Sequence, residues 1–249
     1  MRNLKLTLAY DGTDFSGWQV QPGAETVQGT LASMIGRITG ENVLPQGSGR
    51  TDAGVHALGQ IATFQTNSSI PAVNLVIALN DVLPAAIRVI AAEEAAAEFH
   101  ARKSARGKTY RYRIFREAIC SPFLARYVWH YPYPLDEEAM QQAAPLVEGE
   151  HDFTSFAAVD PERKREEGLS NVRKIFSSQW RREGCELIYE VRGNGFLHHM
   201  VRNLVGTFLL VGKGTLKPEN VRRIIEERNR AAAGATVPAC GLYLVSVEY

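Results

Sequence analysis

The residues of this sequence best suited to chemistry lie in a glycine-rich loop at positions 46–57, which reads QGSGRTDAGVHA. An acid, Asp52, follows a cation, Arg50, by two positions, and the surrounding glycines let the backbone turn sharply and approach a ligand closely. A carboxylate in such a loop can act as a nucleophile or as a base. Because Asp also favours turns, the local pattern leaves open that Asp52 merely caps a turn.

The loop has the spacing of neither common phosphate-binding motif. G-x-G-x-x-G fails because Asp52 stands in the third glycine's place after Gly47 and Gly49. G-x-x-x-x-G-K-[ST] fails at residues 107–109 because Arg102 stands where the first glycine is required. The sequence therefore disfavours nucleotide hydrolysis.

The composition is that of a globular protein of 249 residues with a net charge of +1. No apolar run approaches the roughly 20 residues that a membrane helix needs, and the first residues do not resemble an export signal. Three distant cysteines without a C-x-x-C pair favour neither disulfides nor zinc, and no G-x-S-x-G elbow supports a serine hydrolase. We expect a cytoplasmic protein with no metal and no membrane association.

Cations gather in one stretch although the average charge is almost neutral. Residues 102–116 hold seven cations and no acid, with Tyr110 and Tyr112 among them. Cations beside flat side chains are what phosphates and unstacked bases require, so this stripe indicates RNA binding. The alternative is an ordinary solvated surface.

The elements that must position the loop follow from hydrophobic periodicity. In the first half, alternation predicts a strand at residues 3–10, and helical spacing predicts a helix from Val27 to Ile38 that Gly40 ends. A second helix is expected at 71–83, with short strands at 42–46, 59–66 and 86–92. This β-α-β-β-α-β order is the split βαβ arrangement of ferredoxin-like domains.

The second half reads as a similar unit. We expect strands at 107–117, 125–133, 171–182, 186–192 and 242–249, and helices at 136–147, 196–211 and 218–228. The fold class is therefore α+β, with two ferredoxin-like halves whose mainly antiparallel sheets flank a central active-site cleft. The expected domains are 1–105, which carries the catalytic loop, and 106–249, which completes the cleft. Residues 160–168 are expected to form an exposed, mobile loop.

Several segments together resemble one known family. Residues 49–57, GRTDAGVHA, resemble the catalytic loop of the tRNA pseudouridine synthase A family, and residues 8–19, 99–102, 108–112, 149–156 and 193–203 resemble further blocks in the same order. One departure is Cys240, where a basic residue is expected. The match spans nearly the whole chain, which overturns the turn-cap alternative for Asp52.

The resemblance implies an isomerase that converts uridine to pseudouridine at positions 38, 39 and 40 of the tRNA anticodon stem-loop. It implies no cofactor and no metal, a homodimer, and tRNA as the partner. Asp52 would be the catalytic carboxylate, attacking the base, attacking the sugar or removing a ribose proton, and the residues leave this choice open.

The substrate-binding residues implied by the family are Tyr110, Arg50 and Arg202. Tyr110 would stack on the flipped uridine, Arg50 would guide it or fill its place, and either arginine could pair with Asp52 and keep it ionised. Without the family, Tyr110 would be a core residue and Arg202 a solvated helix cation. The rival function is a non-catalytic RNA-binding module with a ferredoxin-like sheet.

Overall fold

The computed structural model describes residues 1–159 and 170–249, so the loop expected at 160–168 lies outside the described residues. The chain divides into two compact units. Unit 1 comprises Met1–Arg106 and Tyr243–Tyr249, and unit 2 comprises Gly107–Leu242. Residues Tyr243–Tyr249, which we assigned to the second half, thus belong to unit 1, where the final strand pairs with β3.

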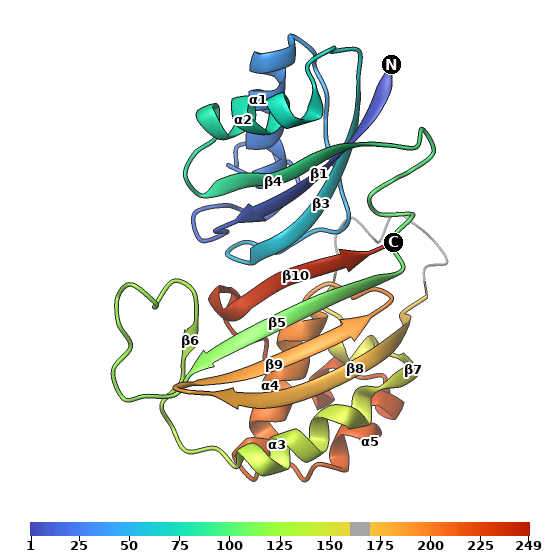
Figure 1. Cartoon of the computed structure of the whole chain (residues 1–249). Helices are drawn as coiled ribbons and strands as arrows, with labels where there is room; N and C mark the ends of the chain where they lie inside the picture. Colours follow the sequence, from blue (N-terminus) through green and yellow to red (C-terminus); the bar gives the residue numbers. More distant parts are fainter. Residues whose placement is uncertain (160–169) are drawn as a thin grey trace. The chain divides into compact units, whose positions relative to one another are not determined.

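Unit 1 is a sheet with two helices on one side (Figure 1). The strand order is β4-β1-β3-β10, and β2 also pairs with β3. Neighbouring strands are antiparallel except for β10, which runs parallel to β3 with Tyr243 opposite His56. The elements are β1 (Arg2–Tyr10), α1 (Val27–Thr39), β2 (Gln46–Gly47), β3 (His56–Thr66), α2 (Ala72–Val82), β4 (Ile87–Ala95) and β10 (Leu242–Glu248).

The first strand and the first helix form as their patterns predict. Leu4, Leu6 and Leu8 of β1 are fully buried, as the alternation requires. Helix α1 begins after Thr26, whose hydroxyl accepts a hydrogen bond from the Gly29 amide, and ends at Gly40, which has a left-handed φ of 74°. β1 and α1 therefore form where these local signals predict them.

Unit 2 has its helices on one face of its strands (Figure 1). The strand order is β5-β9-β8-β7, all antiparallel, and the short β6 lies parallel to β5. The core forms where Phe208 of α4 packs on Trp180 and Tyr189. The elements are β5 (Gly107–Phe115), β6 (Trp129–His130), α3 (Glu137–Ala143), β7 (Gly149–Asp152), β8 (Val172–Glu183), β9 (Glu186–Gly193), α4 (Met200–Gly212) and α5 (Asn220–Glu227).

Several expected elements of unit 2 are shorter than predicted. Only Trp129–His130 of the strand expected at 125–133 pairs in the sheet. The helix expected at 136–147 tightens into a 3-10 helix at Ala144–Val147, where Pro145 lacks an amide donor. Helix α4 starts at Met200, not at 196, because His199 has a left-handed φ of 58°. The mixed α and β class with mainly antiparallel pairing is confirmed.

Candidate functional site

The loop between β2 and β3 is shaped by two glycines of residues 12–17, for which the sequence predicted no such role. A Cβ on Gly12 would lie 2.0 Å from the carbonyl oxygen of Val55. A Cβ on Gly17, whose φ is +89°, would lie 2.6 Å from the carbonyl oxygen of Thr51. Only glycine permits these approaches, so residues 12–17 pack directly on the backbone that flanks Asp52.

Backbone hydrogen bonds fix the loop on both sides of Asp52. The Trp18 amide donates to the Thr51 carbonyl at 3.0 Å, and the Gly54 amide donates to the Phe15 carbonyl at 3.3 Å. Within the loop, the Val55 amide donates to the carbonyl of Asp52 at 3.1 Å, which closes a turn. The backbone on both sides of Asp52 is therefore held by hydrogen bonds.

His56, the first residue of β3, connects the end of this loop to residues 11 and 12 through its ring. Its Nδ1 accepts a hydrogen bond from the Gly12 amide at 3.1 Å and lies 3.3 Å from a carboxylate oxygen of Asp11. Its ring stacks on Tyr243 with centroids 4.8 Å apart, and the residue is 1% exposed. The buried contacts of His56 are those of a structural residue.

Asp52 and Arg50 lie in this loop with different exposure. The Asp52 residue is half-buried, whereas Arg50 is exposed. Partial exposure leaves the Asp52 carboxylate accessible to solvent. The arrangement presents an ionisable oxygen pair on a rigid loop.

Tyr110 lies in β5 of unit 2 with its side chain on the helix-covered side of the sheet. It is 8% exposed, and its ring meets Phe196 edge-on with centroids 5.0 Å apart. Tyr112 and Ile114, which alternate with it, are fully buried on the same side. Tyr110 is thus the most exposed member of a buried row and sits next to the segment that leads into α4.

Arg202 lies in the first turn of α4 and is half-buried. Its Nε donates to the carbonyl oxygen of Val237 at 2.8 Å. Val237 lies in the C-terminal loop, residues 233–238. The next residue of this loop, Pro238, accepts a 2.7 Å hydrogen bond from the Tyr112 hydroxyl. Burial raises the pKa of Tyr112 well above its ordinary value, so this hydroxyl stays a neutral donor.

A buried amide ties the same C-terminal loop to α4. Asn203 is fully buried, and its Nδ2 donates to the Phe156 carbonyl at 2.7 Å. Its Oδ1 accepts from the Thr236 hydroxyl at 2.6 Å and from an Arg230 nitrogen at 2.9 Å. The loop that receives Arg202 is therefore anchored through the adjacent residue of the helix. This role of Asn203 was not predicted from the sequence. The signal for it is an Asn inside an apolar helical pattern.

In the folded chain, acids from other elements offset part of the positive charge of the cationic stripe at residues 102–116. Arg111 pairs with Glu190 at 2.9 Å, Arg113 with Glu186 at 2.6 Å, and Arg116 with Glu137 at 3.3 Å. The partners come from β9 and α3, so no local sequence window reveals them. Arg102, Lys103 and Arg106 remain exposed in unit 1.

His198 and His199 lie in a turn before α4 and not in the helix expected at 196–211. His199 precedes α4 with its left-handed backbone, and its ring lies against that of His198 with centroids 3.9 Å apart. In a helix, neighbouring side chains would point about 100° apart. Nδ1 of His198 also lies 3.2 Å from the carbonyl oxygen of Val159.

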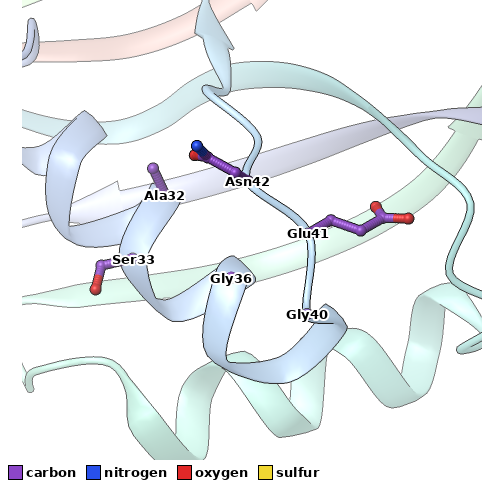
Figure 2. Close-up of a pocket in the computed structure, with 6 residues that line it drawn as sticks. All are labelled: Ala32, Ser33, Gly36, Gly40, Glu41 and Asn42. Atoms are coloured by element: carbon purple, nitrogen blue, oxygen red, sulfur yellow. The ribbon is translucent and has the colours of Figure 1, made fainter.

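A hollow of about 340 Å³ beside the end of α1 does not have the character of a substrate site. Figure 2 shows its lining, in which Glu41 points away from the helix. That carboxylate accepts hydrogen bonds from the Thr66 hydroxyl and the Asn67 amide, which lower its pKa. The lining includes neither a cation nor an aromatic side chain; it consists of Ala32, Ser33, Gly36, Gly40, Glu41 and Asn42.

The structure brings the predicted site residues together in two groups. Asp52 and Arg50 share one loop of unit 1, whereas Tyr110 and Arg202 lie in unit 2 on β5 and α4. The expected ion pair between Asp52 and Arg202 would join the two units and stays a prediction.

The chain resembles proteins of one family along its whole length. A family model described as tRNA pseudouridine synthase matches residues 7–102 and 143–249. A protein of Solibacter usitatus named tRNA pseudouridine synthase A is 53% identical over the full length of both chains. Proteins of the same name from Caldicellulosiruptor bescii and Moorella thermoacetica are 47% and 46% identical over at least 99% of each chain. Within residues 1–159 and 170–249, no helix has the length and apolar character to cross a membrane.

Proposed function

We propose, since the chain belongs to the tRNA pseudouridine synthase family, that it converts uridine to pseudouridine at positions 38, 39 and 40 of the tRNA anticodon stem-loop, with Asp52 as its catalytic carboxylate. The observation that carries this proposal is the 47% to 53% sequence identity, over the full length of both chains, to proteins named tRNA pseudouridine synthase A. The hydrogen-bonded loop around Asp52 supports it, because a reacting group must be held in place.

The reaction is an isomerisation, so it needs no second substrate. The bond between ribose C1′ and uracil N1 breaks, the base rotates, and a new bond forms between C1′ and C5. The proton on C5 is lost and N1 gains one, so atoms and electrons balance. Asp52 can begin this by attacking the sugar, by attacking the base or by removing a ribose proton.

Tyr110, Arg50 and Arg202 are proposed as the substrate-binding residues. A uridine in a stem-loop must leave its stack before its glycosidic bond can be reached, at a cost of a few kcal/mol. We propose that the flipped base stacks on the ring of Tyr110, the least buried of the three residues Tyr110, Tyr112 and Ile114, and that exposed Arg50 supplies a cation in the loop of Asp52. Arg202 is proposed to contact the substrate or the carboxylate from its anchored position on α4.

We extend the proposal to the fold and the assembly. The order β4-β1-β3-β2 in unit 1 supports a ferredoxin-like arrangement there, and we propose the same arrangement for unit 2. We also propose a homodimer that acts on tRNA in the cytoplasm. Light scattering coupled to size-exclusion chromatography tests the dimer, and a mass of one chain, 27.6 kDa, would reject it.

The decisive experiment incubates the protein with unmodified tRNA, without cofactor or added metal, and maps pseudouridine chemically. We expect pseudouridine at positions 38–40 with the parent protein and none with Asp52→Asn, which keeps the shape of the side chain and removes its charge. Asp52→Ala should keep its affinity for tRNA. If the parent binds tRNA without forming pseudouridine, the chain is the non-catalytic RNA-binding module; if Asp52→Asn reacts as fast as the parent, another residue is the catalyst.

A further inference from the structure

The hydroxyl of Tyr10, at the end of β1, is buried beneath the loop that carries Asp52. Tyr10 is 4% exposed, and its hydroxyl lies 2.8 Å from that of Thr51, the residue immediately before Asp52. The side-chain nitrogen of Gln60, a fully buried residue of β3, lies 3.5 Å from the same hydroxyl. Side chains from two strands and the loop thus form one buried polar cluster.

Gln60 extends this cluster to the beginning of the loop. Its Nε2 donates to the Gly49 carbonyl at 2.9 Å, and its Oε1 accepts from the Ser48 hydroxyl at 2.6 Å. The Ser48 amide in turn donates to the carbonyl of Ile61 at 2.7 Å. The segment before Asp52 is therefore attached to the sheet at residues 48, 49 and 51.

We propose that Tyr10 is a positioning residue for the Asp52 carboxylate, acting through its hydrogen bond to Thr51. This inference rests on the proposed function. In the proposed reaction Tyr10 touches neither substrate nor reacting atoms; it fixes the side chain of Thr51 while the Trp18 amide fixes the carbonyl of Thr51. A displacement of about 1 Å at a reacting group can reduce a rate on the order of 100-fold.

The chemistry of the cluster suits a fixed support. Burial raises the pKa of Tyr10 to about 12, so its phenol remains neutral at physiological pH. A neutral phenol can donate its proton to the Thr51 oxygen while it accepts from Gln60. Each buried polar atom of the cluster then has a partner, and a buried network that is fully satisfied is rigid.

Unit 2 contains a matched pair that serves as a control. The Tyr189 hydroxyl lies 2.8 Å from that of Ser178, and both residues are buried between β8 and β9. Tyr189 also has a pKa raised by burial. Tyr189→Phe therefore removes the same kind of hydrogen bond from an equally buried site in the other unit.

The test compares kcat, KM for unmodified tRNA and melting temperature for the parent, Tyr10→Phe, Thr51→Val, Thr51→Ser, the double variant Tyr10→Phe/Thr51→Val, and Tyr189→Phe. Tyr10→Phe and Thr51→Val should each lower kcat about 10- to 100-fold with KM within twofold, and Thr51→Ser should retain the rate. Tyr189→Phe should lower the melting temperature by about as much as Tyr10→Phe does. It should leave kcat within twofold of the parent.

The double variant separates position from stability. Two apolar groups of the original shape can face each other at little cost, so its melting temperature should recover towards that of the parent while kcat stays as low as in the single variants. Recovery of kcat together with stability would overturn the proposal, and so would a Tyr10→Phe protein as fast as Tyr189→Phe. If the parent itself forms no pseudouridine, the proposed function fails instead.

Discussion

At the scale of the residue, Tyr110 is both a core side chain and the proposed surface for the flipped base. Its ring packs edge-on against Phe196, and its place in β5 is set by the alternation that also buries Tyr112. Tyr110→Phe should keep the packing and the stack, so we expect a stable protein in which any loss of kcat reports the hydroxyl. Tyr110→Ala should also destabilise the protein by about 3 to 5 kcal/mol, the usual cost of truncating a buried aromatic residue.

The measurement for Tyr110 is a tRNA titration and a single-turnover rate for each variant. A base that stacks on the ring requires Tyr110→Ala to lose far more activity than Tyr110→Phe at a temperature where both are folded. Equal rates in the two folded variants would mean that Tyr110 serves the core alone.

Two neighbouring residues of α4 hold the C-terminal loop against that helix. Arg202 holds the carbonyl of Val237, and Asn203 holds Thr236. Arg202→Leu leaves that carbonyl without this donor, which costs about 1 to 3 kcal/mol. For a chain of this length we expect a fall in melting temperature of roughly 2 to 4 °C per kcal/mol, together with a loss of pseudouridine formation.

Arg223→Leu is the matched control for this prediction. Arg223 is an exposed helix arginine that pairs with Glu227 one turn away on α5, a contact worth only a few tenths of a kcal/mol. Scanning calorimetry and the tRNA assay should find this variant close to the parent. If Arg202→Leu has the same melting temperature and turnover as Arg223→Leu, Arg202 is an ordinary helix cation.

At the scale of the whole molecule, the sequence predicted the features that depend on local pattern. β1, α1 and the apolar side of β5 are confirmed because alternation, caps and helical spacing are properties of neighbouring residues. The partner of the final strand, the support of the Asp52 loop by Gly12 and Gly17, and the neutralisation of the stripe depend on residues far apart in sequence. No periodicity encodes such pairings.

This distinction leads to a prediction about tRNA affinity, because cations paired with acids differ from cations that face water. Arg111 is bound to Glu190, whereas Arg102 and Lys103 are exposed. Each phosphate contact that is lost should weaken binding and lower the slope of log affinity against log salt by about one. We expect Arg102→Gln and Lys103→Gln to show this effect, and Arg111→Gln to keep the parent's slope while it lowers the melting temperature slightly, as the loss of a partly exposed ion pair does. Affinities measured between 50 and 200 mM salt decide the matter, and a reduced slope for Arg111→Gln alone would show that the pair opens to bind RNA.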